Sequence, residues 1–325
     1  MRSLILLASL LVCAAEAAPQ LTIYTYDSFA SEWGPGPKIK QAFEKQCGCE
    51  IAFVPLEDGV AILNRLKLEG AHSQADLVIG MDEAMLPEAR NSQLFAEHKV
   101  DLQPITLPGG WQDTRFLPFD YGHFAFVYDS SKLKQVPKSL SELAARQDLK
   151  VIYQDPRTST PGQGLLMWVK QTQGDQAAAF WQQLAKHTVT VTKGWSEAYG
   201  MFLKGEADLV LSYTTSPAYH RLAEQKQQYH AALFDEGHYR QVEVAARLKS
   251  AKQPELAERF LKFMLSEEFQ SLIPTGNWMY PVTRVALPKG FNQNETPAKS
   301  LHLDEAQIAA QRKAWLQEWR GAVSQ

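Results

Sequence analysis

Two segments of the chain have the same order of residue types. Each runs from an apolar stretch into hydroxyl side chains, then a proline and a stretch with helical spacing. The first hydroxyl segment reads VIYQDPRTSTPGQG (151–164), and the second reads LVLSYTTSPAY (209–219). Their candidate donors are Ser159, Thr160, Thr214, Thr215 and Ser216. Because hydroxyls and free N–H groups at a helix N-terminus favour an anion, both segments predict a site for a phosphate-like group.

An aromatic residue lies between these two segments. Trp195, in KGWSEAYG, falls in another loop between an expected strand and an expected helix. A ring beside an anion site indicates a small ligand with a phosphate-like group and a flat part able to carry positive charge. The alternative is structural, since the hydroxyls can serve only as turns and helix caps and the indole can cover its own lobe.

The chain that must position these residues alternates between strand and helix patterns. Short runs rich in branched residues predict strands, and helical spacing predicts helices. In the first series, strands are expected at 21–25, 50–56 and 75–80, and helices at 37–46 and 60–69. In the second, strands are expected at 149–153, 189–193 and 208–213, and helices at 165–173, 177–187, 196–204 and 217–227. Two such series predict an α/β protein with two mostly parallel sheets.

Ligands bind beyond the carboxyl ends of strands in an open parallel sheet. Applied to the first series, this rule selects Tyr26, Asp27 and Trp33 after the first strand, and Asp58 and Gly59 after the second. One sheet would offer carboxylates and rings while the other offers donors and rings. For the two aspartates the alternative is simple helix capping.

The length of the chain exceeds what one hydrophobic core usually supports, so two lobes are expected. Strand-like segments at 116–128 and 238–247 are interpreted as crossings between them, followed by helices at 254–265, 267–273 and 304–323. We therefore expect residues 18–118 and 244–325 to form the first lobe and residues 119–243, with the hinge segments, to form an inserted second lobe.

The first 17 residues have a basic start at Arg2, a short apolar run and a small-residue end at Ala15 and Ala17. This pattern is typical of a cleaved secretory leader, because the apolar run is shorter than the roughly 20 residues of a membrane span. Residues 1–17 are thus predicted to be a signal peptide. The formal net charge of −3 gives no indication of nucleic-acid binding.

Two cysteines, Cys47 and Cys49, follow the leader in the run CGCE. Exported chains meet oxidants, so a structural disulfide is one hypothesis. A metal site is the other, and two thiols without nearby histidines make a poor one. No metal site is predicted elsewhere in the sequence.

The sequence contains no convincing catalytic motif. GWSEA lacks the final glycine of the G-x-S-x-G elbow, and no Walker or dinucleotide glycine pattern occurs. The eight histidines are scattered without paired ligand spacing and are interpreted as surface or packing residues. The sequence therefore predicts a binding protein and not an enzyme.

Five long motifs resemble the periplasmic thiamine-binding proteins that serve bacterial ABC importers. They read YTYDSFASEWGPGP (24–37), LEDGVAILNRL (56–66), YQDPRTSTPGQGLL (153–166), TVTKGWSEAYGMFLKGEADLVLSYTTSPAYH (190–220) and IPTGNWMYPV (273–282). The resemblance implies a type II-like, two-lobed periplasmic-binding-protein fold with two crossover strands as its hinge. Each lobe would be a mostly parallel sheet flanked by helices.

The resemblance also implies a set of ligand contacts, carried over motif by motif. The matching positions are Asp58, Gly59, Ser159, Thr160, Trp195, Tyr213, Thr214, Thr215 and Ser216, and five more lie in matching segments, namely Tyr26, Asp27, Trp33, Tyr219 and Trp278. Either Asp27 or Asp58 could hold the pyrimidine amine of thiamine.

The implied function is capture of thiamine, its monophosphate or its diphosphate in the periplasm by a monomer that needs no cofactor. The ligand would pass to an inner-membrane ABC permease. The alternatives are a secreted hydrolase of phosphate esters, or a ferric-ion or polyamine receptor of the same fold. A ferric site would favour adjacent tyrosines, whereas Tyr213 and Tyr219 are separated by five residues.

Overall fold

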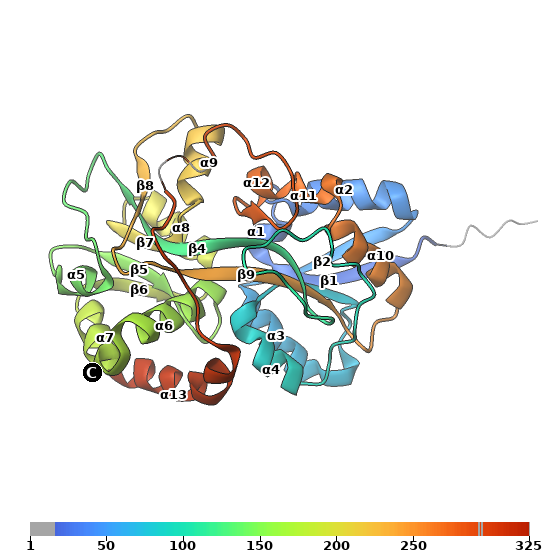
Figure 1. Ribbon diagram of the computed structural model, residues 1–325, viewed down its shortest axis with the longest axis horizontal. Helices are drawn as coiled ribbons and strands as arrows, with labels where there is room; N and C mark the ends of the chain where they lie inside the picture. Colours follow the sequence, from blue (N-terminus) through green and yellow to red (C-terminus); the bar gives the residue numbers. More distant parts are fainter. Residues whose placement is uncertain (1–16, 292, 294, 325) are drawn as a thin grey trace, which may run out of the picture.

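The computed structural model describes residues 17–291, 293 and 295–324. Within these ranges the chain forms two α/β lobes joined by two long strands, as the sequence predicts (Figure 1). The predicted signal peptide lies outside the described residues except for its last position. No helix in the described ranges has both the length and the apolar character needed to cross a bilayer.

In the first lobe, β1 (Gln20–Tyr26) lies between and parallel to β2 (Glu50–Leu56) and β3 (Leu77–Asp82). Apolar side chains of these strands pack under the flanking helices in two buried clusters. The helices of this lobe are α1 (Asp27–Ala30), α2 (Gly36–Cys47), α3 (Gly59–Glu69), α4 (Leu86–Asn91), α10 (Pro254–Met264), α11 (Glu267–Gln270) and α12 (Ile273–Gly276), with short 3₁₀ turns at Gly70–His72 and Glu83–Met85.

In the second lobe, β5 (Val151–Gln154) lies between and parallel to β6 (Thr188–Thr192) and β7 (Leu209–Tyr213). A large and a small apolar cluster form the core of this lobe. Its other elements are β8 (Tyr229–Ala232), α5 (Leu140–Ala145), α6 (Thr160–Gln173), α7 (Ala177–Ala185), α8 (Trp195–Leu203) and α9 (Ser216–Ala223), with a 3₁₀ turn at Gly174–Gln176.

The two lobes are connected by β4 (Leu117–Asp129) and β9 (His238–Arg247), which pair antiparallel. β9 continues onto β3 of the first lobe, and β4 continues onto β7 and β8 of the second. Two short strands, β10 (Tyr280–Pro281) and β11 (Ser300–Leu301), add to β4 and β9. The two strands that cross between the lobes, β4 and β9, are those expected from the sequence at 116–128 and 238–247.

Most expected elements agree with the structure within a few residues, but α6 begins at Thr160 and not at Leu165. Ser159 caps this helix by accepting a hydrogen bond from the Gly162 N–H at 3.4 Å, and Pro161 is tolerated in a first turn. The glycines of TPGQG hid this turn from a reading of helical spacing. The helix expected at 267–273 is interrupted and forms α11 and α12.

The last helix, α13 (Glu305–Val323), lies beside α6 and α7 (Figure 1). Its Trp315 and Trp319 belong to the apolar core of the second lobe, and the Trp319 indole donates to the Tyr153 hydroxyl at 3.2 Å. The sequence assigned this helix to the first lobe, which is wrong for its core packing. An amphipathic pattern shows that a helix has an apolar face but not which core receives that face.

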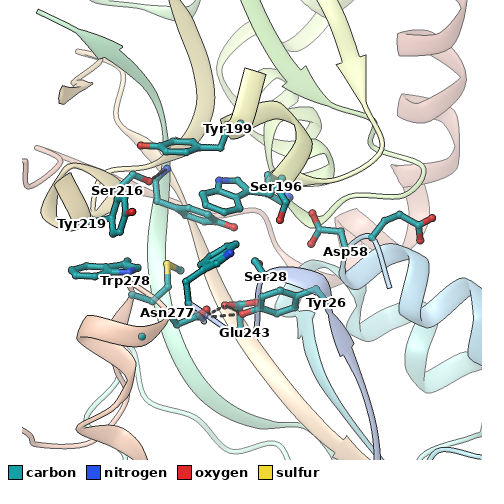
Figure 2. Close-up of a pocket in the computed structure, with 18 of the residues that line it drawn as sticks. Tyr26, Ser28, Asp58, Ser196, Tyr199, Ser216, Tyr219, Glu243, Asn277 and Trp278 are labelled. Carbon is teal, nitrogen blue, oxygen red and sulfur yellow. Dashed lines mark hydrogen bonds between the residues drawn. The ribbon is translucent and has the colours of Figure 1, made fainter. Parts of the chain in front are cut away.

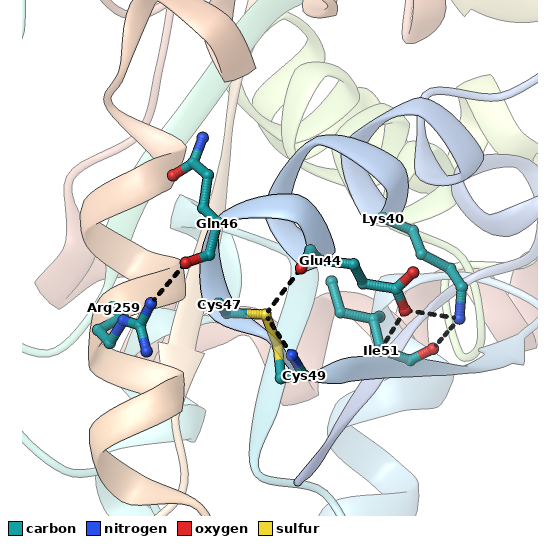
Figure 3. The surroundings of a disulfide bond; sticks show 7 residues. All are labelled: Lys40, Glu44, Gln46, Cys47, Cys49, Ile51 and Arg259. Carbon is teal, nitrogen blue, oxygen red and sulfur yellow. Dashed lines mark hydrogen bonds and ion pairs between the residues drawn. A yellow bond between two sulfur atoms is a disulfide. The ribbon is translucent and has the colours of Figure 1, made fainter. Parts of the chain in front are cut away.

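Cys47 and Cys49 form a disulfide between the end of α2 and the start of β2 (Figure 3). Gly48 between them has φ of 62°, a left-handed conformation that glycine adopts without strain. Beside the disulfide, Glu44 accepts from the Ile51 N–H at 2.8 Å and pairs with Lys40 at 3.0 Å. The bond therefore lies within a structural connection of the first lobe.

Candidate ligand-binding site

A cavity of about 270 Å³ lies between the lobes, where the carboxyl ends of the strands face each other (Figure 2). Both lobes and the crossover strand β9 contribute to its wall. Eight of the predicted site residues line it, namely Tyr26, Trp33, Asp58, Trp195, Tyr213, Ser216, Tyr219 and Trp278. The other six, Asp27, Gly59, Ser159, Thr160, Thr214 and Thr215, are not in its lining.

Four of the predicted residues form an inter-lobe clasp: Asp58 and Gly59 of the first lobe with Ser159 and Thr160 of the second. The Ser159 hydroxyl donates to Asp58 Oδ2 at 2.7 Å, and the Gly59 N–H donates to Thr160 Oγ1 at 3.1 Å. A side chain at Gly59 would collide, because a Cβ there would lie 2.4 Å from Thr160 Oγ1. The carboxylate of Asp58 thus occupies the helix terminus where the sequence predicted a phosphate.

Burial governs the electrostatics of the clasp. Ser159 and Thr160 are fully buried, and Asp58 is 6 % exposed. Burial raises the pKa of Asp58 to about 6, against hydrogen bonds from Ser159 and Gly59 that lower it. Closing the lobes therefore moves a titratable carboxyl out of water.

A second contact between the lobes involves Asp27 and Trp33. The Ser196 hydroxyl donates to Asp27 Oδ1 at 2.8 Å, and the rings of Trp33 and Trp195 lie 6.3 Å apart. Burial also raises the pKa of Asp27. Trp33 is 58 % exposed, which is unusual for so large an apolar ring and fits a residue at the rim of a cavity.

The hydroxyls of the second hydroxyl segment support the aromatic wall of the cavity. The Trp195 indole donates to Ser212 Oγ at 2.8 Å, and Ser212 shares a hydrogen bond of 2.7 Å with Ser216. The Thr215 hydroxyl is 3.9 Å from the sulfur of Met279. Thr214 Oγ1 is buried without a hydrogen-bond partner among the described residues.

Two further rings close one end of the cavity. Tyr219 and Trp278 meet edge to face with ring centroids 5.4 Å apart. Trp278 has φ of 57°, a left-handed conformation that costs free energy in a residue with a side chain. The fold therefore holds this indole in the wall at an energetic cost.

Carboxyl groups occupy the opposite wall. Glu243 lines the cavity and lies beside Asp120, its partner in the β4 and β9 pairing. The Asn277 amide donates to Asp120 Oδ2 at 2.6 Å. It also donates to the Tyr26 hydroxyl at 2.8 Å (Figure 2). Burial raises the pKa of Asp120 to about 7, and burial together with the charge of Asp120 raises the pKa of Glu243.

The charge of the cavity follows from the residues that line it. Glu57, Asp58 and Glu243 line the cavity, and no lysine, arginine or histidine does so among the described residues. Aromatic faces attract cations, and the acidic lining residues put no positive charge beside them to oppose this attraction. The arrangement is suited to a flat cation.

Comparison with known proteins identifies the chain. Residues 38–296 match the family of bacterial extracellular solute-binding proteins. A thiamine-binding periplasmic protein from Salmonella typhimurium is 62% identical over 318 residues, covering 97% of each chain. This chain belongs to the thiamine-binding periplasmic proteins. The family and the periplasmic location predicted from the sequence are confirmed.

Solved structures agree with this assignment. A structure described as a periplasmic thiamin binding protein has a TM-score of 0.93 and 60% identity, and the match covers 95% of this chain and 97% of that one. A ferric binding protein from Campylobacter jejuni has a TM-score of 0.77 at 20% identity, covering 93% and 99% of the two chains. The second likeness shows the fold alone.

The predicted site set lacks several residues in or beside the cavity, among them Glu243, Asp120, Asn277 and Tyr199. Glu243 and Asp120 were overlooked, although Glu243 is the only carboxylate of β9 and Asp120 directly follows an apolar run in β4, signals that could have revealed them. Asn277 is the neighbour of Trp278, and Tyr199 has helical spacing from Trp195. In the part of the chain that the structure describes, no group of three or more histidine, cysteine, aspartate or glutamate side chains could hold a metal ion.

Proposed function

We propose that this protein captures thiamine or one of its phosphate esters in the periplasm and delivers it to an ABC permease in the inner membrane. The observation that carries the proposal is a cavity walled by aromatic rings and carboxyls, with no basic lining residue among those described, in a chain 62% identical to a thiamine-binding periplasmic protein. The protein would act as a monomer and bind one ligand between its lobes.

The chemistry of thiamine matches this wall. Its thiazolium ring carries a permanent positive charge, and its aminopyrimidine ring is flat with hydrogen-bond donors and acceptors. An indole or phenol facing the cation contributes on the order of 0.5–2 kcal/mol. Trp195, Tyr199 and Trp278 are placed to do so.

A phosphate ester would add an anion beside these carboxyls. Its phosphate would have to displace Asp58 from the start of α6, or use the lining hydroxyls of Ser28, Ser196 and Ser216.

Lobe closure would complete the site. The clasp and the contact between Ser196 and Asp27 exist only when the lobes meet, so an open form would present two half-sites of lower affinity. Hinge motion would be concentrated in β4 and β9, which connect the lobes.

Calorimetric titration with thiamine and its two esters tests this function. We expect saturable binding of one ligand per chain, and absence of both heat and fluorescence change with all three would overturn the proposal. Incubation with thiamine diphosphate is the companion experiment. Recovery of unchanged diphosphate supports a receptor, whereas steady release of inorganic phosphate would indicate a hydrolase.

A further inference from the structure

The side chain of His220, on α9, is fully buried behind the aromatic wall of the cavity. Its ring stacks on that of Tyr229 with centroids 3.9 Å apart, and it lies nearly parallel to the ring of Tyr199 at 5.9 Å. The edge of Tyr219 approaches it at 5.0 Å. His220 is therefore a packing centre for rings that come from α8, α9 and β8.

The same histidine forms the middle of a hydrogen-bonded chain. The Tyr199 hydroxyl is 2.9 Å from His220 Nε2, and His220 Nδ1 is 2.6 Å from Glu224 Oε2. Lys226 pairs with the same Glu224 oxygen at 3.3 Å. The charged groups facing this chain are Glu224, Lys226 and Arg221, and Arg221 is paired with Glu295 at 2.9 Å.

The protonation states fix the direction of these hydrogen bonds. Burial lowers the pKa of His220, against Glu224, which raises it. Burial raises the pKa of Glu224, but its hydrogen bond from His220 outweighs this and the pKa is lowered overall. Burial raises the pKa of Tyr199. At neutral pH a carboxylate, a neutral imidazole and a phenol thus face one another, so Nδ1–H donates to Glu224 and Nε2 accepts from Tyr199.

This chain ends at the cavity. Tyr199 lines it and stacks on Trp195, with ring centroids 4.9 Å apart and planes inclined by 20°. In Figure 2, Tyr199 lies across the cavity from Tyr26 and Glu243. On the other side of His220, Tyr219 contacts Trp278. The imidazole of His220 therefore contacts one ring of each aromatic pair, Tyr199 with Trp195 and Tyr219 with Trp278.

We propose that His220 and Glu224 are positioning residues for ligand binding: Glu224 fixes the Nδ1–H tautomer of a neutral His220, whose Nε2 holds the Tyr199 hydroxyl and thereby the Tyr199 and Trp195 rings that face the ligand cation. This proposal rests on the proposed function, because it assumes a cationic ligand. A phenol that donates its proton keeps an electron-rich ring, and a neutral imidazole puts no positive charge behind the wall. The residues touch the ligand only through Tyr199 and Trp195.

The tautomer can be measured directly on the wild-type protein. Long-range ¹H–¹⁵N spectra of the histidine rings, with His220 assigned from the His220→Gln variant, distinguish a protonated Nδ1 from a protonated Nε2. We expect Nδ1–H for His220 at pH 7.5. An Nε2–H tautomer or a doubly protonated ring would overturn the proposal.

Binding by variants tests the link to the ligand. Tyr199→Phe and His220→Leu should each weaken thiamine binding by roughly fivefold, the effect of losing one buried hydrogen bond. Because both remove the same bond, the double variant should be no weaker than either single one. His220→Gln should bind within about twofold of wild type, since its amide can accept from Tyr199 and donate to Glu224.

Tyr229→Phe is the matched control, because Tyr229 stacks on His220 and does not line the cavity. It should bind like wild type. Independent, additive losses in the Tyr199 and His220 variants would refute the positioning role, and so would a loss in His220→Gln as large as in His220→Leu. If His220→Leu does not fold, His220→Phe, whose ring cannot accept a hydrogen bond, replaces it in the same comparison with Tyr199→Phe and the double variant.

Wild-type titration separates this proposal from the proposed function. If the wild type does not bind thiamine, the function fails, and the tautomer alone decides whether the hydrogen-bonded chain exists. If the wild type binds and the affinity losses of the Tyr199 and His220 variants are additive, only the positioning role fails.

Discussion

The two hydroxyl segments have the same order of residue types but meet different surroundings. At the start of α6, Ser159 and Thr160 face the other lobe and bond to Asp58 and Gly59. At the start of α9, Ser216 faces its own lobe and supports Trp195 through Ser212. The sequence of such a segment determines where a helix begins, whereas the opposite surface determines what its hydroxyls bind.

The two segments also differ in charge. The clasp holds a buried carboxyl whose pKa is raised to about 6, so this contact between the lobes includes a titratable group. The contacts of Ser216 are with a hydroxyl and a backbone N–H, neither of which titrates. The first hydroxyl segment therefore joins the two lobes, and the second supports the aromatic wall of the cavity.

The largest effect should come from Ser159→Asp. Aspartate remains a good helix N-cap, so the second lobe should keep its fold. Closure would nevertheless bring two carboxylates together where one hydrogen bond of 2.7 Å now exists, and like charges this close repel strongly. We expect affinity for thiamine to fall about 100-fold, equivalent to roughly 2.7 kcal/mol, and small-angle scattering to show an open form even with ligand.

A charge exchange provides the control for this change. Asp58→Ser combined with Ser159→Asp restores one carboxylate facing one hydroxyl, and serine also caps helices well. Binding should recover to within about tenfold of wild type. If the double variant binds no better than Ser159→Asp, the pair does not act as a clasp.

Trp195→Ala tests the other region, the aromatic wall. Loss of a ring that faces the ligand cation should weaken binding tenfold or more, while Trp195→Phe should retain part of the affinity. Trp111→Ala is the control, because this indole lies outside the cavity and donates to the Phe116 carbonyl at 2.8 Å. Titration of all three variants at one pH measures the contrast. Wild-type affinity in Trp195→Ala would remove this ring from the site.

Much of the fold was predictable because the strand and helix patterns are local. β1, β2 and the crossover strand β9 agree with their expected ranges, since branched residues alternate with clear turn signals. The placement of α13 was not predictable. Its apolar face fits either lobe by pattern, and only the complete fold shows that Trp315 and Trp319 pack in the second.

The site was predictable only in part, for the same reason. Residues at strand ends, such as Tyr26 and Trp195, follow from the general rule for parallel sheets. The roles of Glu243 and His220 do not follow from that rule. Both residues lie inside a strand or a helix, where the sequence pattern indicates only packing. Pairing with β4 brings Glu243 to the cavity, and a hydrogen bond to Tyr199 places His220 behind the cavity wall.

Asp58→Asn tests whether the clasp between the lobes contains a group that titrates. The folded-state pKa of Asp58 is raised, so the folded protein takes up a proton as pH falls through about 6 while the unfolded chain does not. The wild type should therefore gain stability relative to Asp58→Asn between pH 7.5 and pH 5, by on the order of 1 kcal/mol. Urea unfolding at several pH values measures this difference. A difference that stays constant, or grows as pH rises, would contradict a buried, raised carboxyl at this position.

The smallest effect should come from Ser216→Ala. This change removes the 2.7 Å hydrogen bond to Ser212 and the one accepted from the Tyr213 N–H at 3.1 Å, but Ser212 can still accept from the Trp195 indole. Because the indole then loses only an indirect support, we expect thiamine affinity to fall by roughly twofold to threefold at every pH between 5 and 7.5. Thr215→Val is its control, since Thr215 has only a weak contact with Met279. A loss in Ser216→Ala as large as that in Trp195→Ala would mean that the second hydroxyl segment binds the ligand itself, and the contrast with the clasp would then fail.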